Sequence, residues 1–153
     1  MGTHYKGTKK ETGALNVYIK LIRAAESLRS RVISSLSKSG LTESQFGVLD
    51  ALYYLGPLNQ RELGIKIMKS GGNITMVVDN LEKQGLVRRE RGVRDRRLFT
   101  VHLTKQGTDL IEKIFPDILK SIINETAVLN EEEQVELQRL CRMIGLSQYG
   151  TKD

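Results

Sequence analysis

Arginine is the residue type that most clearly suggests a chemistry in this sequence. Between residues 81 and 105 stand eight basic and three acidic side chains, which is nearly the whole net charge of +6 carried by the 153 residues. Arginine binds phosphate oxygens through paired hydrogen bonds, and a local excess of it is typical of a nucleic-acid contact. A merely solvated surface would spread that excess. The arginines available for phosphate are Arg88, Arg89, Arg91, Arg94, Arg96 and Arg97.

Groups that could catalyse a reaction are scarce. His4 and His102 are the only imidazoles, one in a polar terminal segment and one at an outward strand position, and no nucleophile motif accompanies them. Walker, dinucleotide-binding and zinc-protease patterns are absent from the sequence. The supply of histidine and cysteine is too small for a metal cluster. We therefore expect a binding protein, not an enzyme, with no cofactor and no metal.

Cysteine content and hydropathy bear on the cellular compartment. The single cysteine, Cys141, cannot form an internal disulfide, which favours a reducing compartment. Cys141 stands in a helical apolar pattern beside Leu140 and Ile144, so we expect a buried small hydrophobe, with a redox role as the alternative. The first residues are polar and lack the apolar core of a signal peptide, so we expect no targeting segment, and no apolar run approaches the roughly 20 residues of a membrane span. The sequence predicts a cytoplasmic protein, one domain over residues 1–153, with no membrane partner.

Two short helices with clear start signals precede the arginines. Thr42 and Gln45 form a capping box, so a helix should begin at Thr42 and end at Gly56, before a proline. Asn59 and Glu62 repeat the device for a helix that runs to about residue 68. The inner face predicted for the first of these helices is Phe46, Leu49, Leu52 and Tyr53.

A further helix is expected after a break at residues 70–72, ending at Gly85. Its inward stripe, spaced i, i+3, i+4 and i+7, is Ile74, Val77, Val78 and Leu81. Its outward face is Asn73, Met76, Asn80 and Lys83, with Thr75 and Asp79 on the flanks. The outward face carries almost no large aliphatic side chain, as expected of a surface that meets a polar partner.

The apolar period then changes from helical to alternating. Phe99, Val101 and Leu103 alternate with Leu98, Thr100 and His102, which predicts a two-stranded hairpin with a polar tip around Gly92. Two capped helices, a glycine-containing turn and a basic hairpin in this order indicate a winged helix-turn-helix over residues 41–104. The predicted fold class is mainly α with a small β-hairpin wing (α+β).

This order assigns roles for binding double-stranded DNA. In a winged helix-turn-helix the second helix enters the major groove. Side chains placed to meet base edges are Asn73, Thr75, Met76 and Asn80. Phosphate contacts are expected from Ser70, with the freed amides of Gly71 and Gly72, and from the wing arginines Arg88, Arg94, Arg96 and Arg97. Alternatively, Asn73 simply caps its helix, and the arginines are a solvated charge run.

Both chain ends carry long apolar stripes. Helical spacing runs from about Leu15 to Leu36, and again from Thr104 onward with a kink or interruption at Pro116. Asn130 caps a last helix, which Gly145 should close. A small winged module cannot cover these stripes alone, so residues 12–38 and 105–147 are expected to be dimerisation helices.

Three segments resemble the MarR (multiple antibiotic resistance regulator) family: LTESQFGVLDAL, ITMVVDNLEKQGLVRR and DRRLFTVHLTKQG. The resemblance covers about residues 12–147. It implies a two-fold dimer, built from both chain ends, that binds a palindromic operator and regulates transcription. It also implies that Arg97 enters the minor groove while Asp95 holds it in position. Met76 departs from the family, because many relatives carry an arginine after Thr75.

The same resemblance implies a sensor. Family members usually bind a small aromatic or phenolic effector in a crevice beside the dimerising helices, and the segments SGGNIT and DNLEK resemble a branch that responds to quinones. The expected function is thus a ligand-responsive homodimeric repressor that its effector releases from DNA. The alternative is a winged-helix protein that binds DNA nonspecifically or mediates protein contacts without a ligand. Candidate pocket residues, each otherwise an ordinary core aromatic, are Tyr18, Phe46, Tyr53, Tyr54 and Phe115.

Overall fold

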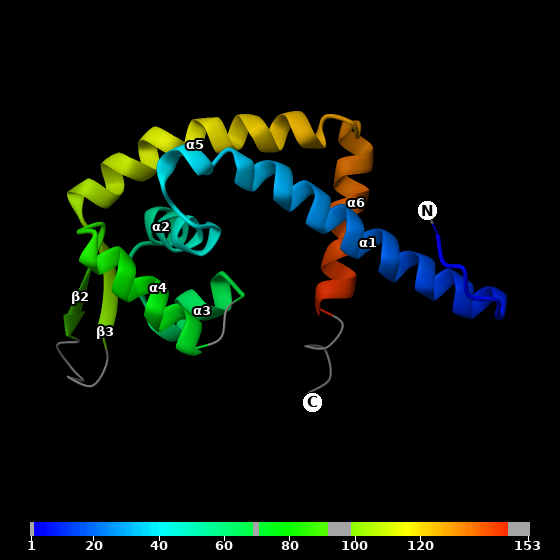
Figure 1. Ribbon diagram of the computed structural model, residues 1–153, viewed down its shortest axis with the longest axis horizontal. Coiled ribbons are helices and arrows are strands. Elements are labelled where there is room, and N and C mark those ends of the chain that lie inside the picture. The colour runs from blue at the N-terminus through cyan, green and yellow to red at the C-terminus, as the bar shows by residue number, and fades with distance from the viewer. Residues whose placement is uncertain (1, 69–70, 92–98, 147–153) are drawn as a thin grey trace. The chain divides into compact units, whose positions relative to one another are not determined.

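The computed structural model describes residues 2–68, 71–91 and 99–146. These residues form two compact units: residues 2–31 with 119–146, and the described part of residues 32–118. The elements in Figure 1 are α1 (Lys9–Ser34), the 3-10 turn η1 (Ser37–Ser39), α2 (Glu43–Leu55), β1 (Leu58–Asn59), α3 (Gln60–Lys66), α4 (Gly71–Lys83), β2 (Val87–Arg91), β3 (Phe99–Leu103), α5 (Lys105–Thr126) and α6 (Glu131–Leu146). The predicted class, mainly helical with a small antiparallel sheet, is confirmed.

The two predicted capping boxes form, and Asn130, predicted as a cap, makes a third with Glu133. The Thr42 hydroxyl accepts from the Gln45 backbone N–H at 3.2 Å, while the Gln45 side chain accepts from the Thr42 N–H at 2.8 Å. The boxes at Asn59 and Asn130 have the same geometry, with every distance 2.9 Å. Gly56 and Gly85 follow their helices with φ of 79° and 72°, the left-handed region that favours glycine. These boundaries therefore come from local interactions that the sequence displays.

Two predicted boundaries are wrong, and at Pro116, where a kink or an interruption was predicted, the interruption does not occur. α4 already includes Gly71 and Gly72, so these glycines do not form a break, and Asn73, the third helical residue, is not its cap. Gly145 lies inside α6 instead of closing it. Pro116 lies within α5, which continues without interruption to Thr126. A glycine costs a helix roughly 1 kcal/mol relative to alanine, which raises the cost of a helix without by itself ending it. Accordingly, α4 includes Gly71 and Gly72, and α6 includes Gly145.

The core of residues 32–118 lies between α2, α3, α4, the sheet and the first part of α5. Its fully buried side chains include Leu49, Leu63, Ile74, Leu81, Ile111, Val48, Val78, Val87 and Val101. The inward stripe predicted for α4 is confirmed, with Val77 half-buried at its margin. The inner face predicted for α2 is wrong at Tyr53, which is 38% exposed, because the helix turns Val48, Leu49 and Leu52 into the core instead.

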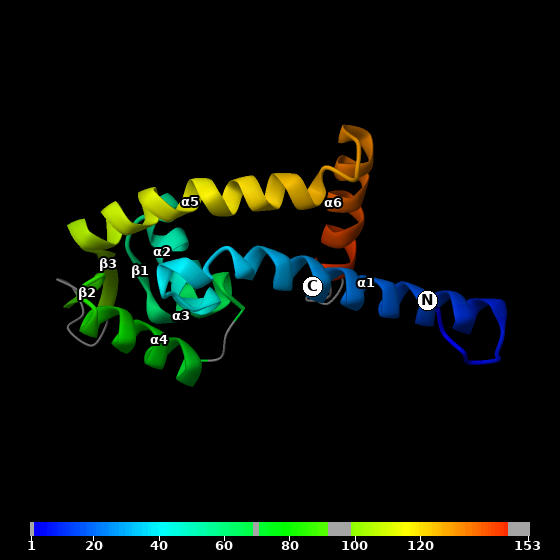
Figure 2. The same cartoon turned by 45° about the horizontal axis from the view of Figure 1, so that its top comes forward.

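The sheet contains a strand that the sequence did not predict. Its order is β1-β3-β2, and β1 pairs antiparallel with β3 through Leu58↔Val101 and Asn59↔Thr100. The predicted hairpin is the pair β2 and β3, in which Arg89 lies opposite Val101. Figure 2 shows the three strands together next to α4. β1 has two residues, too few for an alternating pattern to reveal it.

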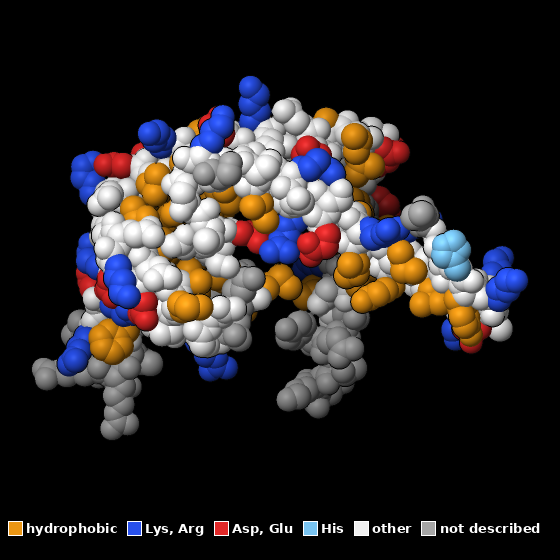
Figure 3. Space-filling model, in the orientation of Figure 1, with side chains coloured by type: hydrophobic (Ala, Val, Ile, Leu, Met, Phe, Trp, Pro, Cys, Tyr) orange, Lys and Arg blue, Asp and Glu red, His pale blue; other side chains and the backbone are white. Residues whose placement is uncertain are grey.

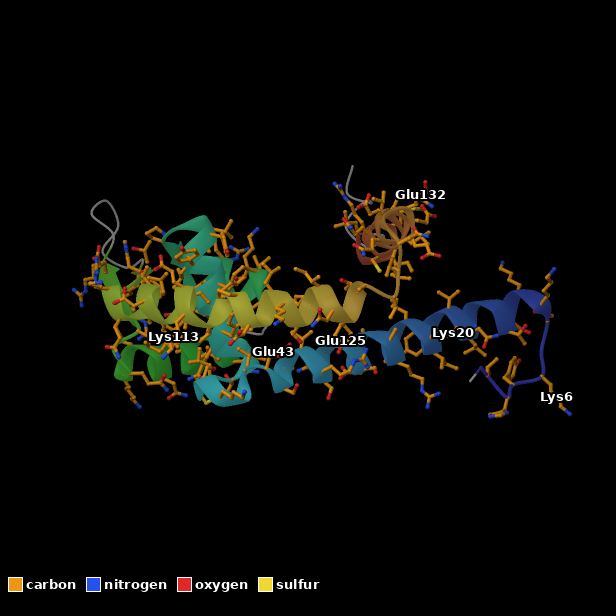
Figure 4. The ribbon with its side chains drawn as sticks, turned by 90° about the horizontal axis from the view of Figure 1, so that it is seen from above. Lys6, Lys20, Glu43, Lys113, Glu125 and Glu132 are labelled. Carbon is orange, nitrogen blue, oxygen red and sulfur yellow. The ribbon has the colours of Figure 1, made fainter. Side chains whose placement is uncertain are left out.

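The other unit consists of α1 up to Arg31, the end of α5, and α6. α1 and α6 contain no buried residue. An ion pair joins Arg31 on α1 to Glu125 on α5. Glu125 is labelled in Figure 4. Among the described residues, no helix combines the length and the apolar run that crossing a bilayer requires.

Candidate nucleic-acid interface

α4 separates a buried stripe from an exposed polar face. Asn73, Thr75, Met76 and Asn80 are all exposed, Met76 to 57%. The opposite side of the same helix holds the buried Ile74, Val78 and Leu81. The residues predicted to read bases are thus all open to solvent, and Figure 1 shows the C-terminal end of α4 next to the hairpin strands.

The two adjacent arginines of β2 have different environments. Successive strand residues point to opposite faces, so Arg89 shares the face of the buried Val87 while Arg88 points to the other. The Arg89 side chain is 18% exposed and the Arg88 side chain 56%. The hairpin therefore offers one of the pair to solvent and keeps the other against α4.

Arg89 is bound by α3 and α4. Its guanidinium forms ion pairs with Asp79 and, at 2.6 Å, with Glu82, and its Nε donates to Oε1 of Gln60 at 3.3 Å. The Arg89 backbone N–H also donates to Glu82, at 2.8 Å. Burial lowers the pKa of Arg89, but the hydrogen bonds that its guanidinium donates to Asp79 and Glu82 outweigh this effect and hold the pKa above its ordinary value. The expectation that Arg89 is available for phosphate is wrong.

The signal for this role was present in the sequence. Arg89 follows the apolar Val87 at the strand period of two, which places it on the inward face. Asp79 and Glu82 are three residues apart on α4, so one side chain can reach both. Gln60, the first residue of α3, was not predicted, because its bonds to Arg89 and Thr75 cross 29 and 15 residues of sequence.

The outer face of the hairpin carries a second polar cluster. Arg88 binds Glu90 at 2.7 Å, and this hydrogen bond lowers the pKa of Glu90. His102 lies 3.4 Å from the other carboxylate oxygen of Glu90 and is half-buried. On the other face of the hairpin, which Arg91 shares with Arg89, the Arg91 guanidinium stands 5.5 Å from the centre of the Phe99 ring, a cation–π distance. Arg88 and Arg91 are the exposed cations in the described part of the hairpin.

Five residues predicted to contact DNA lie outside the described part of the chain. They are Ser70, Arg94, Asp95, Arg96 and Arg97. Their assignment stays a prediction.

The five candidate pocket aromatics do not all gather in one place. Tyr53 and Tyr54 of α2 meet edge to face at 5.0 Å between ring centres, and Tyr54 lies 5.4 Å from Phe115 of α5. Phe46 packs, half-buried, against the core, as the alternative reading expected. Tyr18 belongs to the other unit and is 65% exposed.

The aromatic cluster includes an acid that the sequence did not suggest. The Tyr53 hydroxyl donates to Oε1 of Glu112 at 3.0 Å, and this bond is the main reason that the pKa of Tyr53 is raised.

Cys141 is exposed in the single chain, so the expectation of a buried residue is wrong there. Among residues 2–68, 71–91 and 99–146, no three His, Cys, Asp or Glu side chains come together as a metal site.

A family model, curated relatives and solved structures all point to the same family of proteins. The MarR family model matches residues 41–99. The HTH-type transcriptional regulator MhqR of Bacillus subtilis (strain 168) is 34% identical over 134 residues, which cover 88% of this chain and 92% of the relative. These relatives are transcription regulators and not enzymes.

Two solved structures share the fold. Sco3205, a MarR family transcriptional regulator from Streptomyces coelicolor in complex with DNA, superposes with a TM-score of 0.82 at 23% identity, over 95% of this chain and 92% of that one. BpsR of Bordetella bronchiseptica, whose DNA binding is regulated by 6-hydroxynicotinic acid, gives a TM-score of 0.77 at 26% identity, over 84% and 98%. Since identity and fold agree over nearly the whole length, this chain belongs to the MarR family of transcription regulators.

Proposed function

We propose that the protein is a homodimeric repressor that binds a palindromic operator and is released from it by a small aromatic or phenolic effector. The observation that carries this proposal is the exposed polar face of α4 beside the basic hairpin. Residues 41–104 would contact DNA, and residues 12–38 and 105–147 would form the dimer. A regulator with bacterial relatives of this kind acts on chromosomal DNA, hence in the cytoplasm.

Specificity would come from the outward face of α4. Asn73 and Asn80 have side-chain amides that can pair bidentately with adenine, and Met76 can contact the methyl group of thymine. Thr75 lies on the same exposed surface. The four side chains combine polar and apolar readout in one short helix, as a major-groove reader requires.

Affinity would come from contacts to phosphate. Arg88 is exposed and held in place by Glu90. By the family resemblance, Arg97 would enter the minor groove with Asp95 holding it. Ser70, Arg94 and Arg96 would add phosphate contacts at the start of α4 and in the wing. Each phosphate that a cation neutralises steepens the salt dependence of binding by about one counterion.

The dimer is supported by the lack of a core in the unit formed by the chain ends. Neither α1 nor α6 buries a residue, although both carry large apolar side chains. Figure 3 shows hydrophobic side chains on the open surface of α1. Exposed apolar residues of this unit include Val17, Tyr18, Ile22, Ile122, Ile123, Val135, Leu137, Leu140 and Met143. A second copy of the chain would cover them and would place two α4 helices about 10 bp apart on DNA.

Oligomeric state tests the dimer directly. Leu140→Glu puts a charge on the apolar face of α6, and we expect sedimentation to show a shift from dimer to monomer. Ile65→Glu is the control, since Ile65 is 68% exposed on α3, in the other unit. A wild-type monomer, or a Leu140→Glu protein that remains dimeric, would contradict the proposal.

The effector site is supported by the cluster of Tyr53, Tyr54 and Phe115. The two tyrosine rings are exposed and the Phe115 ring is half-buried, and aromatic rings in contact offer a surface to another flat ring. BpsR, which shares the fold, is regulated by an aromatic acid. Release of operator DNA by a panel of phenols and quinones, with Tyr54→Ala as the variant, tests this part. We expect Tyr54→Ala to keep DNA affinity and to lose release.

Selection of bound sequences from random DNA tests the whole proposal. We expect an enriched palindrome for the wild type, a changed preference at one position of each half-site for Asn73→Ala, and an unchanged motif for Lys113→Ala, a charge-removing control on α5. Sequence-blind binding, or no binding, would favour a nonspecific DNA coat or a protein-contact module and would refute the regulator.

A further inference from the structure

One side chain connects the base of the hairpin to the exposed face of α4. The Gln60 amide oxygen accepts from Nε of Arg89 at 3.3 Å, and the Gln60 amide nitrogen donates to Oγ1 of Thr75 at 2.9 Å. Thr75 is exposed on α4, whereas Arg89 is largely buried. Gln60 therefore lies in the chain of contacts between a fixed arginine and a residue that faces the DNA.

The orientation of the Gln60 amide is fixed by its partner. A guanidinium has donors only, so the amide oxygen must face Arg89 and the amide nitrogen must face Thr75. A flipped amide would place donor against donor at Arg89. Arg89 is itself held by Asp79 and Glu82, so it provides a rigid reference.

This orientation limits what Thr75 can offer to a base. A hydroxyl has one hydrogen to donate and two lone pairs to accept with. The Thr75 hydroxyl donates to the Gly71 carbonyl at 3.1 Å and accepts from Gln60. One lone pair and the methyl group remain. In this state Thr75 can accept from the amino group of adenine or cytosine or touch a thymine methyl, but it cannot donate to guanine.

We propose that Gln60 is a positioning residue for base readout, which sets the preference of Thr75 without itself reading a base. The inference rests on the proposed function, since it requires that α4 reads DNA. Without the Gln60 donor, the Thr75 hydroxyl has a second free lone pair and a freer rotor. The ratio of affinities for the preferred and the other bases at the position that Thr75 contacts then falls by roughly two- to tenfold. This factor corresponds to the free energy of one neutral hydrogen bond.

The test is a double-mutant cycle read out as base preference. Gln60→Met keeps the length of the side chain and removes both hydrogen bonds, while Thr75→Val keeps the shape and removes the hydroxyl. Random-sequence selection is run on the wild type, both single variants and the double variant. We expect Gln60→Met to relax preference at one position per half-site in the wild-type background and to have no effect in the Thr75→Val background.

Two further variants separate positioning from other effects. Gln60→Glu keeps the acceptor for Arg89 and removes the donor for Thr75, so it should also alter preference at that position, with a uniform loss of affinity from its charge. Gln106→Met, the same exchange on α5, should leave the motif unchanged. Thermal unfolding verifies that each variant is folded.

The outcomes are distinguishable. A wild type without an enriched motif refutes the proposed function itself. A wild-type motif that Gln60→Met leaves unchanged refutes the positioning role alone. A change in preference that persists at full size in the Thr75→Val background also refutes it, because Gln60 would then act directly or through another residue.

Discussion

The neighbouring arginines of β2 give a sharp test of how the hairpin is built. We replace each by methionine, which keeps a long apolar stem and removes the charge. Arg89→Met leaves Asp79 and Glu82 without their cation beside the core. Arg88→Met removes the arginine partner of one carboxylate, Glu90, on the outer face, where His102 still lies 3.4 Å away. The two variants have the same composition and charge, so any difference between them comes from the face of the strand.

The expected magnitudes follow from exposure. Exposed ion pairs contribute little to stability, and both side chains of the Arg88–Glu90 pair are about half exposed, so Arg88→Met should leave the free energy of unfolding nearly unchanged. Removing one partner of a fully buried pair costs roughly 3–5 kcal/mol. Asp79 and Glu82 are 46% and 38% exposed, and water screens them, so we expect roughly 2 kcal/mol for Arg89→Met.

Thermal or urea unfolding at one fixed protein concentration measures this. For a chain of this size, roughly 2 kcal/mol lowers Tm by about 4–8 °C, against almost no change for Arg88→Met. DNA binding should show the reverse order: the salt dependence of affinity falls by about one for Arg88→Met and is unchanged for Arg89→Met. Equal losses of stability, or a lower salt slope for Arg89→Met, would refute the assignment of the two faces.

Three other substitutions test the fold. Met68→Asn should raise the free energy of unfolding by about 0.5–1 kcal/mol in urea titration, because Met68 has φ of 55° and is 90% exposed, and asparagine adopts that conformation more readily. Gly107→Ala should cost about 1–3 kcal/mol or abolish folding, since a Cβ there would lie 2.0 Å from the Leu86 carbonyl oxygen. Burial raises the pKa of Asp50, so the folded protein favours the protonated carboxyl group. The contribution of Asp50 to the free energy of unfolding is therefore complete below the ordinary pKa of 3.8 and is lost as pH rises through the raised pKa of the folded state. Asp50→Asn should raise Tm at neutral pH and leave it unchanged below pH 3.8.

Each of these three has an outcome that contradicts its reasoning. A less stable Met68→Asn would mean that the methionine makes a contact which its exposure conceals. A stable Gly107→Ala would mean that α5 can shift away from Leu86. For Asp50→Asn, an equal change of Tm on both sides of the ordinary pKa would show that the charge is not the cause.

The sequence alone determined the local architecture. Thr42 with Gln45, and Asn59 with Glu62, start their helices through hydrogen bonds three residues apart, so the residue types suffice to predict them. The stripe of α4 and the alternation of β3 were equally readable, because each follows from the period of a single element. The polar outward face of α4 follows from the same geometry.

The tertiary structure decided which of these side chains remain available. The strand period already puts Arg89 on the inward face and Arg88 on the outer one, but only the packing of β2 on α4 brings Arg89 to Asp79 and Glu82. β1 and the bond from Gln60 to Thr75 exist only because segments distant in the chain come together. Local patterns encode where an element begins and which way it faces, whereas ion pairs and hydrogen bonds between elements depend on positions that no single element specifies.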